Sequence, residues 1–244
     1  MTNTYKIAEH NIQVASIYED IHRLCSDYQS SAQPIDFVVQ TQQSDIDFER
    51  SKSAREDEVE GNLVREFHDG YLETLAVYRQ IAEKMPAYDI VLCHGSAVAV
   101  DGQAYLFIAK SGTGKSTHTR LWRELLGERA VMVNDDKPLV HVTDAGAVVY
   151  GTPWDGKHHL SRNIDVPLKA VCILTRGAEN RIEPATPAEA FPMLMQQVYR
   201  PADPASLSKT LNLIEKLAAS VRLWRLSCNM ELDAARVAYE GMKG

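Results

Sequence analysis

In "YLFIAKSGTGKSTHTRLW", residues 105–122, glycines separate an apolar run from an amphipathic segment. Glycines leave backbone N–H groups free to converge on an anion, because no side chain stands in the way. Gly112 and Gly114 lie on either side of Thr113, and Lys115 follows. A helix that begins near Gly114 points the positive end of its dipole at the same anion. The pattern predicts a phosphate-binding loop.

The sequence on either side of this loop supports the interpretation. Residues 104–108 predict a strand that enters the loop, and a helix is expected to leave it and run to about Leu126. Ala109 stands where the full pattern has its first glycine, a position that mainly shapes the turn. We expect Lys115 to reach the β- and γ-phosphates of a nucleotide and Ser116 to place its hydroxyl on Mg²⁺. The expected nucleotide-binding residues of the loop are Ser111, Gly112, Thr113, Gly114, Lys115, Ser116 and Thr117.

A pair of acids follows at a distance that suits the loop. The apolar part of "AVMVNDDKP", residues 130–138, predicts a strand with Asp135 and Asp136 at its C-terminal end, where the ligands of α/β sheets collect. Neighbouring residues of an extended chain point in different directions. One carboxylate can therefore meet a metal while the other faces an acceptor. The alternative is a polar turn after a strand, and the residues alone do not divide the roles between the two acids.

Two further stretches carry candidate site residues. His94, in "LCHGS", follows a predicted strand shortly before the loop. Its side chain has two possible roles: a structural hydrogen bond, or a contact with the γ-phosphate or the acceptor. The segment "YGTPWDGKHHLSRN", residues 150–163, is predicted to be a loop because of its glycines and proline. Within it, Trp154 is a candidate cover for a ligand. Asp155 is a candidate metal-side acid, and Lys157, His158 and Arg162 are candidate phosphate contacts, unless the segment is only a charged surface loop.

Three pieces in this order resemble a known family: "HGSAVAVDGQAYLFIAKSGTGKST" with His94, the loop itself, and "VNDDKP". They are similar to the catalytic domain of the HPr kinase/phosphorylase family, which shares a P-loop fold with phosphoenolpyruvate carboxykinases. The resemblance covers about residues 89–142, extends to about 175, and leaves out the first 85 residues. It is strongest to HPr-kinase-related proteins of peptide biosynthesis clusters, some of which phosphorylate a serine of a precursor peptide.

The resemblance implies a site that uses ATP and Mg²⁺. It implies that Asp135 is the base that activates the acceptor hydroxyl, that Asp136 is the metal-side acid, and that His94 lies near the transferred phosphoryl group. The family's acid and arginine-glycine signature downstream of the paired aspartates is missing, and residues 150–163 stand in its place. The resulting candidates are His94, Lys115 and Asp135 for catalysis; Ser116, Asp136 and Asp155 for metal; and the loop residues with Lys157 for the nucleotide.

Composition sets the class of protein and narrows its partners. The chain has 244 residues, 45% apolar and 24% charged, as is ordinary for a globular protein. A formal charge of −7 provides no footprint for nucleic acid. The four cysteines are far apart in the sequence, so we expect them to be reduced thiols. No signal peptide or apolar membrane span is visible, so we expect a cytoplasmic protein without a membrane partner. Homo-oligomerisation stays open.

The expected fold is α/β with a mixed sheet, of the HPr kinase type. We divide the chain into a small α+β region, 1–86, and a catalytic domain, 87–244, that ends in helices. In the first region we expect a hairpin over 5–16, a helix over 17–29, and a solvated helix or mobile segment over 44–61. A firmer helix, ended by Pro86, is predicted from the 3.6-residue spacing of Leu63, Phe67, Tyr71, Leu75, Tyr78, Ala82 and Met85.

Three functions fit these residues. The first is a Mg²⁺/ATP-dependent kinase that phosphorylates a serine-type hydroxyl of a peptide or protein. The second is a kinase for a small hydroxylated metabolite, which uses the same residues. The third is a regulatory nucleotide-binding NTPase without an acceptor. The paired aspartates favour transfer to an acceptor, and the chain offers no assignable water-orienting glutamine or arginine finger for the third.

Overall fold

The computed structural model describes residues 1–156 and 158–244 and has a mixed α/β fold. Its contacts divide the chain into two compact units, Met1–Ala82 and Glu83–Gly244. Each unit has a sheet of its own. In the described part of the chain, no helix is both long and apolar enough to cross a membrane.

The first unit is built on a three-stranded sheet. Strands β1 (Thr2–Ile7) and β2 (His10–Ala15) form the predicted hairpin, and β3 (Phe37–Gln40) lies parallel to β2. The helix predicted over 17–29 is wrong in extent: only α1 (Asp20–Leu24) is α-helical, followed by a 3₁₀ turn, η1 (Ser26–Tyr28). The helix begins late because the N–H groups of Ile17 and Tyr18 donate to the buried carboxylate of Glu73, at 2.7 and 2.8 Å.

Residues 44–61, predicted as a helix or a mobile segment, lie in helix α2 (Gln43–Glu60) and its C-terminal cap. Two carboxylates of this helix form ion pairs with arginines outside it. Arg79 Nε lies 2.6 Å from Glu49, and Arg65 Nη2 lies 2.6 Å from Asp57. Gly61, at φ 71°, ends the helix in the left-handed conformation that glycine tolerates.

The next helix, α3 (Asp69–Lys84), is shorter than its apolar spacing predicted. Leu63 and Phe67 precede the helix, and the side chain of Leu63 is 92% exposed. The main-chain N–H of Arg65 donates to Asp57 at 2.9 Å, which ties this connection back onto α2 and keeps it non-helical. The predicted end at Pro86 is confirmed, because Pro86 lies in the 3₁₀ turn η2 (Met85–Tyr88) that follows α3.

The second unit contains a nine-stranded mixed sheet and four α-helices among its described residues. The strands are β4 (Ile90–Leu92), β5 (Ser96–Val100), β6 (Gln103–Ile108), β7 (Ala130–Asn134), β8 (Leu139–Thr143), β9 (Gly146–Tyr150), β10 (Asp165–Arg176), β11 (Arg181–Pro184) and β12 (Arg222–Cys228). The helices are α4 (Lys115–Leu126), α5 (Pro187–Gln197), α6 (Pro204–Ser220) and α7 (Leu232–Met242), with a 3₁₀ turn η3 (Gly127–Arg129) after α4.

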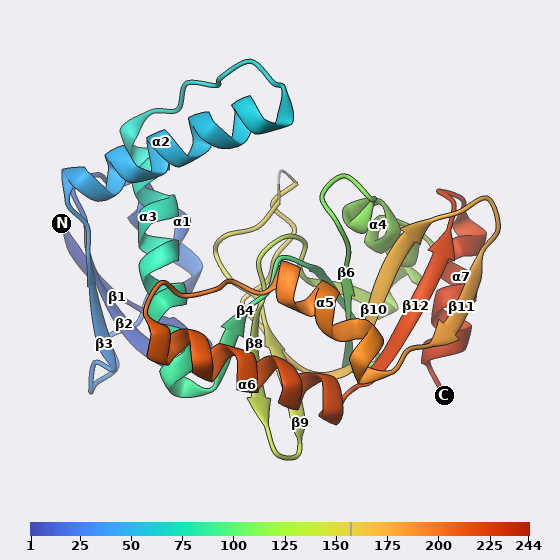
Figure 1. Cartoon of the computed structure of the whole chain (residues 1–244). Helices are drawn as coiled ribbons and strands as arrows, with labels where there is room; N and C mark the ends of the chain where they lie inside the picture. Colours follow the sequence, from blue (N-terminus) through green and yellow to red (C-terminus); the bar gives the residue numbers. More distant parts are fainter. Residues whose placement is uncertain (157) are drawn as a thin grey trace. The chain divides into compact units, whose positions relative to one another are not determined.

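Strand β10 holds this sheet together (Figure 1). Its first residues pair antiparallel with β9, and the rest lies parallel to β6 on one side and β12 on the other. Strands β5 and β6 form a hairpin, and Asp101 and Gly102 have positive φ of 51° and 77° in its turn. Strands β8 and β9 form a second hairpin. Strand β11 was not predicted, because its four residues are mostly polar.

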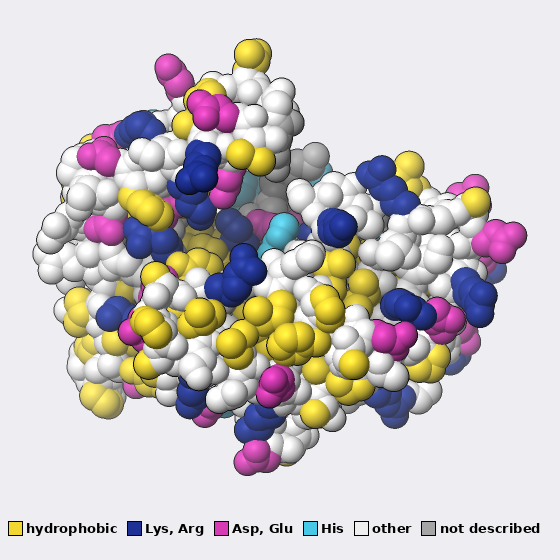
Figure 2. Space-filling model, in the orientation of Figure 1, with side chains coloured by type: hydrophobic (Ala, Val, Ile, Leu, Met, Phe, Trp, Pro, Cys, Tyr) yellow, Lys and Arg dark blue, Asp and Glu magenta, His cyan; other side chains and the backbone are white. Residues whose placement is uncertain are grey.

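Alternating side chains of the central strands pack into two hydrophobic cores, one on each face of the sheet. On β6, Leu106 and Ile108 join a core with residues of α5 and α6, while Tyr105 and Phe107 join a second core with residues of α4 and α7. The sheet is therefore covered by helices on both faces, which explains why its strands are apolar on both sides. On the face shown in Figure 2, apolar side chains gather over α5 and α6, and charges of both signs are interspersed elsewhere.

Helix α4 packs its inner face through aromatic contacts. Trp122 is fully buried and lies 5.2 Å from the ring of Phe107, in a T-shaped arrangement. Its Nε1 donates to Nε2 of His118 at 3.0 Å. His118 is 2% exposed, and burial lowers its pKa to about 4. The helix that leaves the glycine loop is thus held by a neutral buried histidine.

We predict that His118→Gln removes a pH dependence from the stability of this unit. The unfolded chain protonates His118 near pH 6.5, whereas the folded chain does so only near pH 4, so the free energy of unfolding falls as pH drops through this window. The loss approaches roughly 3 kcal/mol, at about 1.4 kcal/mol per pKa unit. Glutamine can still accept from Trp122. Denaturant unfolding at pH 7 and 4.5 measures the effect, and an equal pH dependence in variant and wild type contradicts it.

Candidate active site

The glycine loop connects β6 to α4 as the sequence predicted, with a strand before it and a helix after it. Gly112 and Gly114 have φ values of 72° and 119°, which L side chains rarely adopt. The N–H of Thr113 donates to the carbonyl of Lys110 at 3.2 Å and closes the turn. The first N–H groups of α4, which begin after Gly114, have no partners inside the helix. They can therefore bind an anion.

A cavity of about 670 Å³ lies over this loop. It brings together most of the residues predicted for the site: His94, Ser111, Gly112, Gly114, Lys115, Ser116, Thr117, Asp135 and Asp136. Thr113 and Asp155 are not among its lining residues. Lys157 lies outside the described residues. Loop, histidine and paired acids, which are separate in sequence, therefore share one cavity.

Lys115 is buried at the base of the cavity. Its side chain is 9% exposed, and Nζ donates to the carbonyl of Ala109 at 3.3 Å. Burial lowers the pKa of Lys115, and the nearby Asp136 carboxylate and Cys93 thiol oppose that shift. The ammonium group is thus held in a desolvated place that an anion would stabilise.

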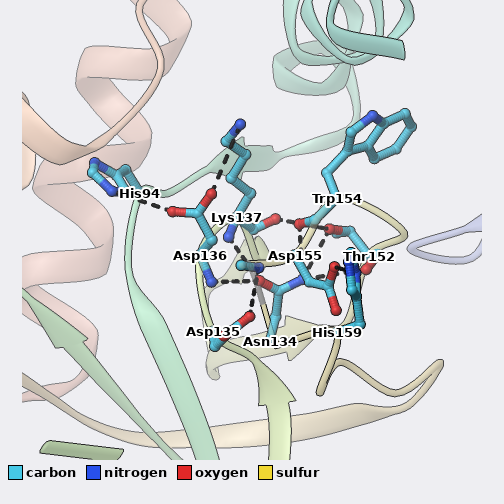
Figure 3. A network of polar contacts seen from close by, with 10 residues as sticks. His94, Asn134, Asp135, Asp136, Lys137, Thr152, Trp154, Asp155 and His159 are labelled. Carbon is cyan, nitrogen blue, oxygen red and sulfur yellow. Dashed lines mark hydrogen bonds and ion pairs between the residues drawn. The ribbon is translucent and has the colours of Figure 1, made fainter. Parts of the chain in front are cut away.

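His94 and Asp136 lie side by side because their backbones are paired. The N–H of Cys93 donates to Pro138 O at 3.1 Å, and the N–H of Gly95 donates to Asp136 O at 3.0 Å. This places His94 Nε2 at 3.3 Å from Asp136 Oδ1 (Figure 3). Burial alone would raise the pKa of Asp136, but the bond from His94 and the charge of Lys137 hold it below its usual value. Asp136 is therefore ionised at neutral pH.

Asp135 meets a different environment. It is 4% exposed, and its Oδ1 accepts from the N–H of Gly156 at 2.6 Å. Burial raises its pKa, the bond from Gly156 lowers it, and the neighbouring charges of Asp155 and Asp136 raise it further. The pKa values of the two adjacent carboxylates are thus shifted in opposite directions. Such a pair of shifts separates acid and base roles within a site.

The buried amide of Asn134 holds the paired acids in place (Figure 3). Its Oδ1 accepts from the N–H groups of Asp136 and Lys137, at 2.9 and 2.7 Å. Its Nδ2 donates to Thr152 Oγ1 at 3.0 Å and to Trp154 O at 3.2 Å. One side chain therefore joins the turn that carries the acids to the segment that approaches Asp135 from the other side. The sequence reasoning did not single out this residue.

The loop over 150–163 departs from its predicted roles. Both oxygens of Asp155 serve the loop itself: Oδ1 lies 2.9 Å from His159 Nδ1, and Oδ2 accepts from the N–H of Ser161 at 3.3 Å. Trp154 is 5% exposed and does not line the cavity, so it is not a cover for a ligand there. His158 does line the cavity, whereas Arg162 does not.

Arg176 and Gln197 reach the loop from distant parts of the chain, and the sequence reasoning missed both. Arg176 ends β10, which lies parallel to β6, and its guanidinium donates to the carbonyl of Gly112. With its amide in the orientation that satisfies its hydrogen bonds, Gln197 at the end of α5 donates to Ala109 O at 3.0 Å and to His94 O at 3.1 Å. For Arg176 there was a signal, an arginine at the end of an apolar strand; for Gln197 there was none.

We predict that Asn134→Ala destabilises the second unit by about 2–4 kcal/mol, because buried backbone donors and acceptors lose their partner. Denaturant unfolding measures the change. Asn212→Ala, at an exposed position of α6, is the matched control and should change stability by less than about 0.5 kcal/mol. Equal, small effects of the two substitutions would show that the Asn134 contacts do not hold the two segments together.

No group of three or more His, Cys, Asp or Glu side chains placed to hold a metal ion occurs among the described residues. Magnesium sites of phosphoryl-transfer enzymes commonly use only one or two carboxylates, with water and phosphate oxygens as the other ligands. The pair of Ser116 and Asp136, both at the cavity wall, is a donor set of that kind.

Comparison with known proteins adds little beyond the fold. No protein-family model matches the chain, and no curated protein matches it. Among solved structures, the HPr(Ser) kinase/phosphatase from Coxiella burnetii matches over 63% of this chain and 99% of that chain, with 9% sequence identity and a TM-score of 0.34. The similarity is a distant one of fold, and it carries no information on substrate or site.

Proposed function

We propose that the second unit is a Mg²⁺/ATP-dependent phosphotransferase that moves the γ-phosphoryl group of ATP to a serine-type hydroxyl of a peptide or protein. One observation carries the proposal: a glycine loop with a buried lysine shares a cavity with two carboxylates whose pKa values are displaced in opposite directions. An anion-binding loop alone would need no acids opposite it. A base and a metal-side acid are what transfer to an acceptor requires.

The triphosphate would bind at the start of α4. The N–H groups of the first turn of α4 and the helix dipole favour phosphate there, and Lys115 supplies a buried positive charge. Arg176, whose guanidinium already contacts the carbonyl of Gly112, adds a second cation at the loop. A desolvated lysine gains most from a polyanion, because burial has removed the water that would otherwise solvate it.

The residues present fit a magnesium ion bound with the nucleotide. Asp136 is the carboxylate kept ionised by His94 and Lys137, and Ser116 offers a hydroxyl beside the loop. Both groups supply the hard oxygen ligands that Mg²⁺ prefers. When bound, the ion would neutralise charge on the β- and γ-phosphates. Asp155 is less suited to this role, because it does not line the cavity and its oxygens bind within its own loop.

In the transfer step, the acceptor oxygen forms a bond to the γ-phosphorus as the bond from that phosphorus to the β–γ bridging oxygen breaks. ADP leaves with the electron pair of that bond, and the acceptor proton passes to a carboxylate oxygen of Asp135. Because burial raises the pKa of Asp135, it is a better proton acceptor than an exposed aspartate. Its bond from Gly156 orients the carboxylate. Lys115 stabilises the charge on the equatorial oxygens.

We expect Lys115→Ala to abolish nucleotide binding and transfer, and Asp135→Asn to keep nucleotide binding but lose transfer by about 10²–10⁴-fold, the usual contribution of a general base. Calorimetric titration with Mg²⁺ and ATP measures the first property. Mass spectrometry of serine-containing peptides and proteins after incubation with γ-labelled ATP measures the second. Full activity in both variants would place the active site elsewhere.

We also expect the acid limb of the kcat/KM profile to report Asp135. Activity requires its ionised form, so activity falls as pH drops through its raised pKa. Asp155→Asn removes a charge that raises this pKa, so the acid limb should move to lower pH while magnesium dependence stays unchanged. A weaker magnesium dependence would instead assign Asp155 to the metal. An unmoved acid limb would take Asp135 out of the base role.

A further inference from the structure

The lining of the cavity includes cationic side chains that the proposed function leaves unexplained. This part of the lining consists of Arg120 and Arg123 of α4, Met132 of β7, and His158 and Leu160 of the following loop. We call these five residues the far arm. No motif in the sequence drew attention to its two arginines.

Helix geometry places the arginines in line with the phosphate loop. Ser116, Arg120 and Arg123 follow each other at spacings of four and three residues, so they share one face of α4. At about 1.5 Å per residue, Arg123 lies roughly 10 Å along the helix axis from Ser116. The phosphate site and the two arginines therefore follow each other along one face of α4, and Asp135 lines the same cavity.

The charge of the far arm is unusual for this chain. The protein carries a formal charge of −7, yet two guanidinium groups line this arm. In the described part of the chain, Arg123 is half-buried and has no carboxylate partner. Arg120 reaches Glu124 at 3.3 Å, an exposed pair of one helical turn that is worth little. Both arginines are thus available to an anion from outside.

We propose that the far arm binds the acceptor, and that the acceptor carries an anionic group, a carboxylate or a phosphate, beside its hydroxyl. The inference rests on the proposed phosphotransfer. Guanidinium groups pair with carboxylate and phosphate through two parallel hydrogen bonds, which fixes orientation as well as affinity. With its anion on Arg120 and Arg123, an acceptor presents its hydroxyl toward Asp135. The buried Met132 and the half-buried Leu160 suit a short apolar part between the two groups.

The nucleoside of ATP is a weaker occupant of the far arm. Adenine and ribose carry no anionic group, so they would meet the two guanidinium groups only through stacking or neutral hydrogen bonds. The charge of the triphosphate is met at the start of α4, by the loop amides, Lys115 and Arg176. An anionic acceptor, in contrast, uses both the charge and the shape of the arm.

The test compares acceptors that differ only in charge. One set contains serine peptides with acidic, neutral or basic residues next to the serine. The other contains N-acetyl-L-serine and glycerate beside their uncharged amides, N-acetyl-L-serinamide and glyceramide. Transfer of label from γ-labelled ATP gives kcat and KM for each, and calorimetry with a non-hydrolysable ATP analogue and Mg²⁺ gives binding without turnover. The two sets distinguish a peptide from a small hydroxy acid as the source of the anion.

The variant is the double substitution Arg120→Gln with Arg123→Gln, and Arg236→Gln, at an exposed position of α7, is the control. We expect wild type to prefer the anionic members of at least one set. In the double variant, KM and Kd for those acceptors should rise about tenfold or more, and the preference for charge should vanish. KM for ATP should not change. Arg236→Gln should behave as wild type.

Three results would overturn the inference. In the first, wild type binds anionic probes no better than neutral ones. In the second, the double variant keeps the preference. In the third, KM for ATP rises and acceptor selectivity does not change, which would assign the arm to the nucleotide. Failure of the proposed function itself looks different, because calorimetry would then detect no Lys115-dependent binding of ATP at all.

Discussion

The site depends on one buried amide, that of Asn134. A side-chain amide in a fully buried position is stable only if its donors and acceptor are satisfied, because an unpaired buried polar group costs about 1–3 kcal/mol. Asn134 meets this condition by accepting two main-chain N–H groups from the turn that carries the acids and donating to the segment around Thr152. Two segments of irregular backbone are thereby held as one rigid wall of the cavity.

The opposite behaviour of the two acids follows from that wall. Asp135 faces the segment that Asn134 holds, where the N–H of Gly156 lies 2.6 Å from its Oδ1 and little water reaches it. Asp136 faces the strand end that carries His94, and its carboxylate lies 3.3 Å from that ring. Two carboxylates that are adjacent in sequence thus face different neighbours. Their pKa values move apart because burial, hydrogen bonds and nearby charges differ between the two carboxylates.

Two glycines near the site lie where a side chain would collide with a neighbouring group. A Cβ on Gly156 would lie 2.6 Å from Asp135 Oδ2, and one on Gly95 would lie 2.8 Å from Leu106 Cδ1. The lack of a side chain at Gly156 lets the backbone come close to Asp135, and at Gly95 it leaves room for the core side chain of Leu106. The position of Asp135 therefore depends on main chain as well as on side chains, which suits a site that must stay ordered before any ligand arrives.

Much of the second unit is readable from its sequence, because the decisive signals there are local. The alternation of "AYLFI" and the glycines of the loop each act within a few residues, and each appears in the structure where it was expected. The capping box of Thr186 and Glu189 at the start of α5 is an equally local signal. The apolar spacing through Leu63 and Phe67 failed for a non-local reason, since Arg65 binds back to Asp57 on α2.

What the sequence could not provide is which distant groups meet. Arg176 reaches Gly112 only because β10 lies parallel to β6, and Gln197 reaches Ala109 only because α5 ends over the same sheet edge. Asp155 was a candidate metal ligand by residue type, but its oxygens are used within its own loop. Pairings of this kind depend on the register of strands that are far apart in the chain, which periodicity does not encode.

Lys115 links the fold to the proposed chemistry. A lysine that is 9% exposed is costly to keep charged, and the direction of its pKa shift shows that Asp136 offsets the cost only in part. The surroundings of Lys115 are thus short of negative charge. A polyanion bound at the start of α4 would raise the pKa of Lys115 toward and beyond its ordinary value. Binding of phosphate and the charge of the lysine would then stabilise each other, in a place where water is largely excluded.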